Sequence, residues 1–152
     1  MFPEKTDGFT AVPRFLPPET ANAPDGLALA FIGDAVWSLM ARDFILSQAD
    51  ARVQTLHERT AMICNAAFQA AAAERIAPKL TAQEEGIFKR GRNARVGHVP
   101  KNKSQAEYHR ATGVEALFGW LYLRGESERI GELFRAAIRN DPADDTKEDP
   151  FS

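Results

Sequence analysis

Residues 27–41 read Leu-Ala-Leu-Ala-Phe-Ile-Gly-Asp-Ala-Val-Trp-Ser-Leu-Met-Ala, fifteen positions with a single charged side chain, Asp34. A second run, residues 112–123, reads Thr-Gly-Val-Glu-Ala-Leu-Phe-Gly-Trp-Leu-Tyr-Leu and also carries one charge, Glu115. Helices that are apolar on nearly every face lie at the centre of a fold. The two runs therefore predict two central helices, each with one carboxylate at or near the core.

The rest of the chain also has the periodicity and the boundary residues of helices. The helices that we expect cover residues 25–48, 53–76, 82–90, 104–123 and 127–139. Asp25 and Ser104 are expected N-terminal caps, and Thr81 and Glu84 form a capping box. Pro78 ends the second helix, and Gly125 follows the fourth as its stop. No stretch alternates apolar and polar side chains in the way a strand does. We therefore predict an all-α fold.

The two ends of the chain differ in composition from the helical body. Residues 1–24 hold five of the nine prolines, which predicts an irregular N-terminal arm. Residues 141–152 carry five acids against one base, which predicts a disordered acidic tail. The remaining residues, 25–140, form the single globular domain that is usual for a chain of 152 residues.

Composition excludes several classes of protein. Hydrophobic residues make up 44% of the chain and charged residues 26%, the balance of an ordinary globular protein. No apolar run approaches the roughly 18 residues of a membrane span, and the N-terminus lacks the layout of a signal peptide. Cys64, the one cysteine, cannot form an internal disulfide, and we expect a buried thiol. These features predict a cytoplasmic protein without a membrane partner.

A buried carboxylate needs compensation, because burying one without a partner costs several kcal/mol. The sequence leaves three alternatives open for Asp34 and Glu115. The first is an ion pair with an arginine such as Arg42 or Arg110, the second is protonation, and the third is a bound cation. A glycine closely precedes each acid and would let two helices approach. Hard oxygen ligands with room for several waters suit Mg²⁺, so a magnesium site is one candidate.

The net charge of −2 conceals a basic stretch, because residues 89–110 hold seven bases and one acid. Its densest part, Lys-Arg-Gly-Arg-Asn-Ala-Arg at residues 89–95, enters an expected loop over residues 91–100. Such a loop can lie along a phosphate backbone, although a solvated charged loop is the alternative. Aromatic side chains are nearly absent here, which favours duplex binding over stacking on single strands.

Other chemistries lack their motifs in this chain. The three histidines, His57, His98 and His109, do not have the spacing of a zinc site. His57 is followed by Glu58, so the adjacent His-Asp pair of a metallophosphohydrolase is missing. There is no glycine-rich phosphate loop and no serine nucleophile elbow.

Three segments in the same order resemble one known family. Residues 27–36 resemble the signature helix of ribonuclease III, and residues 89–95 and 108–123 are similar to its later motifs. The resemblance is closest to the Mini-ribonuclease III branch and covers about residues 24–135. It implies the helical ribonuclease III catalytic domain without the appended double-stranded-RNA-binding domain. It also implies a homodimer whose signature helices pair across a two-fold axis.

The resemblance assigns roles to individual residues. Asp34 and Glu115 match the catalytic carboxylates that hold Mg²⁺, and Phe31 matches an aromatic that inserts into the partner subunit. Full-length ribonuclease III has two further acids where this chain has Ala30 and Thr112, which leaves two metal ligands. The basic segment matches the RNA-contacting loop, and we assign RNA contact to Lys89, Arg90, Arg92, Asn93, Arg95, Lys101 and Lys103.

The implied activity is magnesium-dependent cleavage of double-stranded RNA by an endoribonuclease that leaves 5′-phosphomonoesters. The implied substrate class is precursor ribosomal RNA, that of the 23S species. An alternative is a catalytically silent ribonuclease III-like scaffold that binds RNA or ribosomes, but a scaffold has no need of two costly acids. A purely structural helical dimer leaves the basic stretch unexplained.

Overall fold

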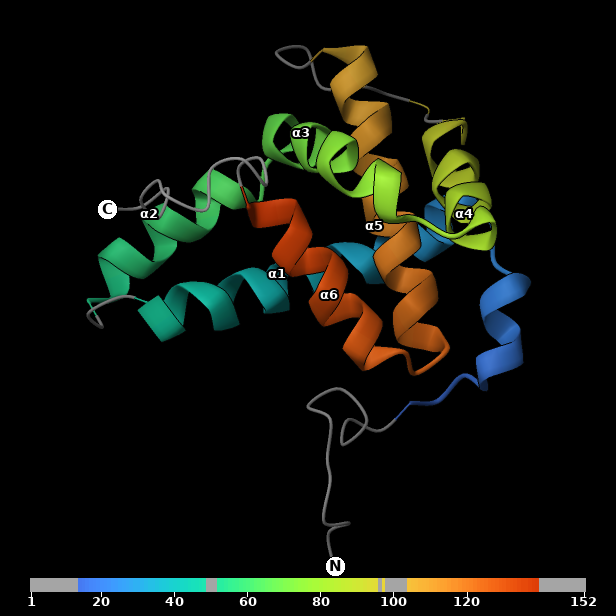
Figure 1. The fold of residues 1–152 in the computed structure, drawn as a ribbon, viewed down its shortest axis with the longest axis horizontal. Helices are drawn as coiled ribbons and strands as arrows, with labels where there is room; N and C mark the ends of the chain where they lie inside the picture. Colours follow the sequence, from blue (N-terminus) through green and yellow to red (C-terminus); the bar gives the residue numbers. More distant parts are fainter. Residues whose placement is uncertain (1–13, 49–51, 96, 98–103, 140–152) are drawn as a thin grey trace, which may run out of the picture.

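The computed structural model describes residues 14–48, 52–95, 97 and 104–139 (Figure 1). Within these ranges the chain forms helices and no strand, so the prediction of an all-α fold is confirmed. In chain order the elements are η1 (Pro18–Asn22), α1 (Gly26–Gln48), α2 (Val53–Ile63), α3 (Ala66–Ile76), η2 (Ala77–Lys79), α4 (Ala82–Arg92), α5 (Gln105–Leu123) and α6 (Ser127–Ile138).

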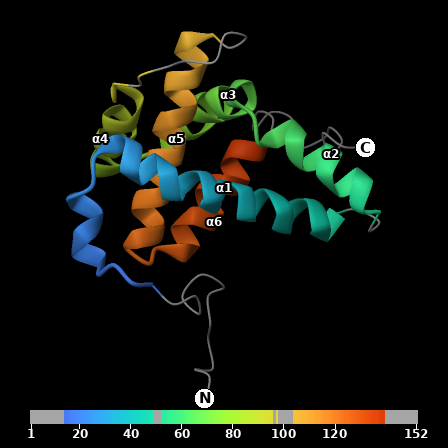
Figure 2. The same cartoon turned by 180° about the vertical axis from the view of Figure 1, so that it is seen from behind.

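Helix α5 is the centre of the fold. It contacts α1, α3, α4 and α6, and Figure 2 shows α1 crossing it. Between residues 111 and 121 every side chain of α5 except that of Glu115 is buried. Trp37 of α1 packs edge-on against Phe118 of α5 and Phe134 of α6, with ring centroids 5.2 and 5.0 Å apart. Edge-on aromatic pairs of this kind stabilise a core beyond the area that they bury.

Helix α1 buries only one of its two apolar sides. Leu29 and Trp37 point into the core and have no exposed surface. On the opposite side lies an exposed apolar face whose members are Leu27 (40% exposed), Phe31 (84%), Leu39 (52%) and Leu46 (59%). The prediction of a helix that is central on every side is therefore confirmed for α5 and wrong for α1.

The single helix expected over residues 53–76 is wrong, because the chain breaks it into α2 and α3 at Asn65. The side chain of Asn65 caps α3 by accepting a hydrogen bond from the backbone N–H of Phe68 (2.9 Å). Its amide nitrogen also donates to the last carbonyls of α2, those of Ala61 and Met62. Asparagine is a strong helix N-cap, and this cap outweighs the high helix propensity of the alanines that follow.

The other boundaries follow their expected capping residues. Thr81 and Glu84 form the predicted capping box, and Ser104 caps α5. Gly125, the expected stop after α5, adopts a left-handed conformation with φ 73° that favours glycine. Helix α4 continues to Arg92 instead of ending at residue 90, so half of the basic segment is helical.

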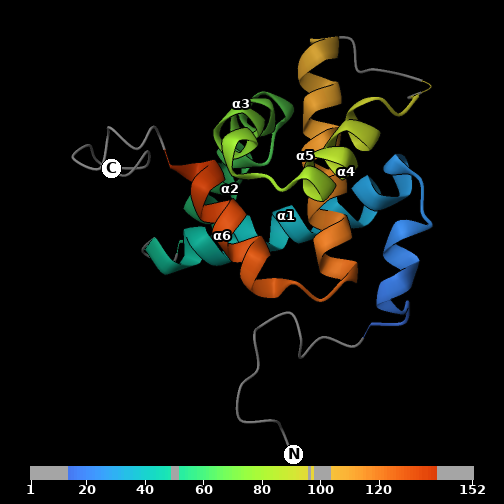
Figure 3. The ribbon, with the colours of Figure 1, turned by 45° about the vertical axis from the view of Figure 1, so that its right-hand side comes forward.

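The N-terminal arm contains more structure than its prolines predict. Residues 18–22 form η1, and Figure 3 shows this short helix alongside α5. Ala21 in η1 has no exposed surface. Residues 1–13 and the predicted acidic tail lie outside the described residues. Among the described helices, none is long and apolar enough to cross a membrane.

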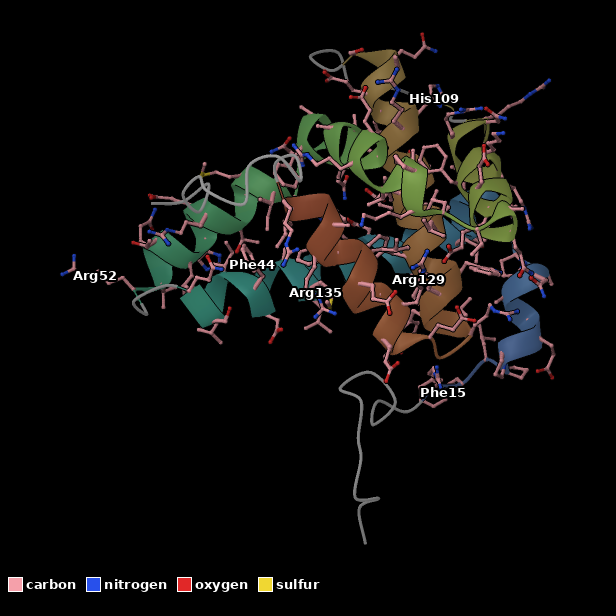
Figure 4. All side chains as sticks on the ribbon, in the orientation of Figure 1. Phe15, Phe44, Arg52, His109, Arg129 and Arg135 are labelled. Atoms are coloured by element: carbon pink, nitrogen blue, oxygen red, sulfur yellow. The ribbon has the colours of Figure 1, made fainter. Side chains whose placement is uncertain are left out.

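An ion pair ties the start of α4 to α6. The guanidinium of Arg129, labelled in Figure 4, donates to both carboxylate oxygens of Glu84 at 2.9 and 2.8 Å and to the carbonyl of Lys79 at 2.7 Å. Glu84 is only 3% exposed. These hydrogen bonds from Arg129 hold the pKa of Glu84 below its usual range, against the opposing effect of burial. Bidentate pairs of this geometry are the strong class of salt bridge.

Candidate active site

Helices α1 and α5 cross with their backbones in direct contact. A Cβ atom on Gly33 would lie 1.6 Å from the carbonyl oxygen of Glu115, and one on Gly119 would lie 2.0 Å from the carbonyl oxygen of Leu29. No side chain fits at either position, so the crossing requires glycine on both helices. Asp34 follows Gly33 directly, and the crossing therefore brings the backbones that carry the two lone acids together.

The glycines of the crossing are buried, but the acids beside them are not. Asp34 is exposed and Glu115 is half-buried, so the expectation of a carboxylate at or near the core is wrong for Asp34 and holds in part for Glu115. Asp34 lies on α1 at the border between the buried side and the exposed apolar face. A carboxylate in this position remains hydrated and needs no counter-ion.

The two arginines that the sequence offered as partners, Arg42 and Arg110, have other contacts. Arg42 donates to the carbonyl of Ser38, one turn back in its own helix. Arg110 pairs with Glu74 at 3.2 Å. In the part of the chain that the structure describes, Asp34 takes part in no ion pair. The ion-pair alternative for Asp34 is therefore not realised.

The pKa of the Cys64 thiol responds to both acids, which indicates that Asp34 and Glu115 lie near the same region. Burial raises the pKa of the Cys64 thiol, a hydrogen bond with Ser38 and the charge of Arg42 oppose the rise, and the charges of Asp34 and Glu115 add to it. Both carboxylates thus act on one thiol at the α2–α3 junction. The side chain is half-buried instead of buried as expected. Its raised pKa keeps it protonated near neutral pH, which makes it a poor nucleophile.

The donor set suits a hydrated magnesium ion and not a fully protein-bound metal. Over the described ranges, no group of three or more acid, histidine or cysteine side chains lies close enough to hold a metal. Ala30 offers no donor, and the hydroxyl of Thr112 donates to the carbonyl of Tyr108 in its own helix. Mg²⁺ usually keeps several waters and binds one or two carboxylates together with phosphate oxygens. Asp34 and Glu115 fit that requirement.

The basic segment leaves α4 beside Glu115. A Cβ atom on Gly91 would lie 2.4 Å from the Cβ of Ala116, so the end of α4 is in tight contact with the residue next to Glu115. On its other side, a Cβ atom on Gly26 would lie 2.6 Å from the carbonyl oxygen of Arg90. The end of α4 is therefore held between α5 and the first turn of α1.

The cations of the segment have different surroundings, and three of them have partners within the protein. The ammonium of Lys89 pairs with Glu85 at 2.8 Å across one exposed turn of α4, an arrangement that is easily given up. The guanidinium of Arg90 donates to the carbonyls of Asn22 and Pro24 in the N-terminal arm. Arg90 is thus bound to the backbone of the protein.

The last residues of the segment differ in exposure, and Arg92 is half-buried. Arg92 lies over the ring of Phe88, with 5.9 Å between the guanidinium carbon and the ring centroid, and its Nε donates to the side chain of Asn93 at 3.2 Å. Arg95 and Asn93 are exposed. The remaining two expected RNA contacts, Lys101 and Lys103, lie outside the described residues. Arg92, Asn93 and Arg95 therefore form the described part of the basic surface next to Glu115.

Phe31 and Asp34 are neighbours on α1. They are three positions apart, which corresponds to about one turn along the helix and roughly 60° around it. Phe31 is the most exposed member of the exposed apolar face, and the acid lies at the border of that face. A partner that covered Phe31 would therefore lie close to the acids.

Comparison with known proteins identifies the family. The model of the Ribonuclease III domain matches residues 27–126. Mini-ribonuclease 3 from Symbiobacterium thermophilum is 40% identical over 127 residues, which cover 84% of this chain and 92% of the relative. The chain belongs to the Mini-ribonuclease 3 family. As a member of that family, it is an endoribonuclease.

Further relatives support membership of the Mini-ribonuclease 3 family. Mini-ribonuclease 3 from Gloeobacter violaceus is 42% identical over 106 residues, 70% of this chain and 76% of the relative. The crystal structure of a Fusobacterium nucleatum protein has a TM-score of 0.70 and 31% sequence identity, and covers 78% of this chain and 95% of that one. The match extends along most of the helical body, so the ribonuclease III fold is shared.

Three contacts of the candidate site could not be predicted from the sequence. Gly113 was expected to let α5 approach α1, but a Cβ atom there would meet the ring of Phe88 in α4 at 2.7 Å. Gly119 makes the contact with α1 instead, and its only signal was a second glycine within an apolar run. The contact of Gly91 with Ala116 and the bonds from Arg90 to the arm had no signal at all, because they join positions distant in sequence.

Proposed function

We propose that the protein is a magnesium-dependent endoribonuclease that cuts double-stranded RNA, with Asp34 and Glu115 as the ligands of the metal. The observation that supports the proposal is the backbone contact between Gly33 and Glu115, which brings together the backbones that carry the two acids. An exposed carboxylate without an ion-pair partner in the described ranges, as Asp34 is, is open to a cation that RNA phosphates could share.

The residues of the chain divide the work at this site. When bound, the magnesium ion would lower the pKa of a water molecule and stabilise charge on the scissile phosphate. Half-buried Glu115, on the rigid central helix, fixes the position of one ligand. Exposed Asp34 supplies the second ligand on the side open to solvent. The fixed distance between α1 and α5 holds both oxygens in place before substrate arrives, and such preorganisation accounts for much of catalysis.

The basic surface next to Glu115 binds the phosphate backbone of the duplex. Arg92 and Arg95 supply positive charge there, and Lys89 can exchange its exposed pair with Glu85 for a phosphate. Backbone contacts of this kind add affinity without reading bases, as recognition of double-stranded RNA by shape requires. We assign precursor 23S ribosomal RNA in the cytoplasm as the substrate, with hydrolysis that leaves 5′-phosphomonoesters.

The enzyme acts as a homodimer in this proposal, with the exposed apolar face of α1 as the interface. Phe31 is 84% exposed, and an aromatic side chain in water at the middle of an apolar face favours burial against a second copy. Because Asp34 borders this face, dimerisation brings the two active sites close to the two-fold axis. A duplex that spans the axis can then be cut in both strands.

The direct test is incubation of the purified protein with a plain RNA duplex, with and without Mg²⁺. We expect cleavage that stops when the metal is chelated, and products with 5′-phosphate ends. Duplex binding without cleavage at any Mg²⁺ concentration would favour the silent RNA-binding scaffold. Absence of binding to the duplex would refute the proposed substrate class.

The proposed RNA surface has its own test. Replacing Arg92 and Arg95 with alanine should weaken binding to unrelated duplexes alike and flatten the dependence of log affinity on log salt, by roughly 0.9 for each lost phosphate contact on the duplex-DNA value. Binding is measured in Ca²⁺ to prevent turnover. The control is Arg139→Ala, which removes an exposed arginine beyond the end of α6. An unchanged salt slope in the double variant would show that this surface does not contact RNA.

A further inference from the structure

Residues 14–25 form a strap across the helical body, which we call the N-terminal strap. Near its start, Arg14 donates to the carbonyl of Tyr122 at the end of α5 (3.0 Å). In its middle, the indole N–H of Trp120 donates to the side chain of Asn22 (3.1 Å), and Ala21 is fully buried. Figure 3 shows η1, the helical part of the strap, beside α5 and leading into the start of α1. The strap is therefore anchored to the central helix at two points.

Arg90 fastens the strap to the end of α4. One nitrogen of its guanidinium donates to the carbonyl of Asn22 at 3.5 Å, and the other terminal nitrogen donates to the carbonyl of Pro24. Gly26, the first residue of α1, also lies against the backbone of Arg90 and Gly91. A Cβ atom on Gly26 would lie 2.6 Å from the carbonyl oxygen of Arg90. The strap thus holds α4 at the point where the basic surface begins.

We infer that Arg90 is a positioning residue for RNA binding: it clamps the end of α4 to the N-terminal strap so that Arg92 and Arg95 are held beside Glu115. This inference rests on the proposed function. The guanidinium of Arg90 donates to two backbone carbonyls, so it cannot bind a phosphate with the same N–H groups. Gly91, the next residue, carries the clamp to α5 through its contact with Ala116. The strap, the basic surface and the catalytic acid are joined by consecutive contacts.

A lysine substitution separates positioning from charge. Arginine presents several N–H groups in a planar fork and can bridge two carbonyls, whereas a lysine ammonium is a compact point charge that satisfies phosphates equally well. Arg90→Lys should therefore behave like Arg90→Ala and raise the Kd for duplex RNA about tenfold, measured in Ca²⁺. The matched control is Arg139→Lys, which makes the same exchange at an exposed arginine beyond the end of α6 and should leave the Kd within about twofold of wild type.

The strap offers a second variant that changes no charge. Asn22→Ala removes the acceptor of the Trp120 indole and loosens the strap without altering any cation. We expect it to weaken duplex binding as Arg90→Lys does. In the double variant the two effects should not add, because both act through the same clamp. The cleavage rate at saturating RNA should fall less than twofold in both, since the acids are untouched.

The outcomes distinguish this inference from the proposed function. If the wild-type protein does not bind the duplex, the proposed function is wrong, and the inference, which depends on it, is wrong as well. If the wild type binds and Arg90→Lys binds equally well while Arg90→Ala does not, Arg90 is a phosphate contact and the inference is wrong. Full additivity of Asn22→Ala and Arg90→Lys would also overturn it. Melting temperatures close to wild type establish that the variants are folded; if Arg90→Lys unfolds, Asn22→Ala alone decides through its effect on Kd.

Discussion

Replacing Gly33 with alanine should separate α1 and α5, the helices that carry Asp34 and Glu115. The added Cβ would lie 1.6 Å from the carbonyl oxygen of Glu115, whereas ordinary contact begins near 3.4 Å, so α1 and α5 would have to move apart by up to the difference, about 1.8 Å. The carbonyl oxygen belongs to the backbone of the central helix, so it cannot move away by changing a side-chain rotamer. The distance between Asp34 and Glu115 would change by a comparable amount.

The consequences can be estimated from that displacement. A misplacement of about 1 Å in a catalytic group can cost roughly a hundredfold in rate, so we expect Gly33→Ala to lose at least that factor in kcat. Overpacking should also lower stability by about 1–3 kcal/mol. The assay is single-turnover cleavage of an RNA duplex at saturating enzyme, with a thermal melt of the same preparation.

The chain offers a matched control in Gly86. It lies in the middle of α4, and a Cβ there would meet nothing within 4 Å. Gly86→Ala should cleave normally and gain up to about 1 kcal/mol from helix propensity. Wild-type cleavage and melting by Gly33→Ala would refute the idea that the backbone contact sets the spacing of the acids.

Three further predictions concern the interface, the basic segment and the fold. Phe31→Ala should raise the monomer fraction in sedimentation, because truncating an aromatic that the proposed dimer buries should cost about 3–5 kcal/mol, as it does in a core; a wild type already monomeric at micromolar concentration would contradict the dimer. Gly91→Ala should weaken duplex binding because its Cβ would lie 2.4 Å from that of Ala116, and Ala116→Gly should partly restore it; no recovery would count against this contact. Glu84→Gln should cost about 2 kcal/mol near neutral pH by breaking the pair with Arg129. Because Arg129 lowers the pKa of Glu84, the ion pair stabilises the fold above the ordinary pKa near 4.5. This stabilisation is lost as pH falls through the lower pKa of the folded state, so the difference in unfolding free energy between wild type and Glu84→Gln should shrink in acid, as measured by urea denaturation.

Local signals in the sequence predicted most of the helices. The capping box of Thr81 and Glu84, the cap at Ser104 and the stop at Gly125 act within four residues, so they can be read without a structure. Asn65 carried the same kind of signal, but its alanine-rich surroundings favoured one continuous helix. The competing preferences could be weighed only once the packing of the α2–α3 junction was known.

Contacts between distant elements decided what the sequence could not. The two lone acids were found from their apolar surroundings, yet their exposure depends on how much of α1 the core covers. Gly119 acts on α1 through its backbone, and Arg90 acts on carbonyl groups that any residue possesses. Contacts with backbone atoms do not depend on residue type, so they leave no pattern in the sequence. The sequence therefore could not show whether a basic side chain such as Arg90 binds an RNA phosphate or a carbonyl of the protein itself.

The most direct test of the proposed function is magnesium-dependent cleavage of one plain RNA duplex by the wild type and by Asp34→Asn and Glu115→Gln. Amides hold Mg²⁺ far less strongly than carboxylates do. We expect each variant to keep its melting temperature and its sedimentation behaviour and to lose cleavage, and the double variant to be little worse than either single one, because the acids act as a unit. Near-normal cleavage by purified Asp34→Asn would contradict the assignment of the active site.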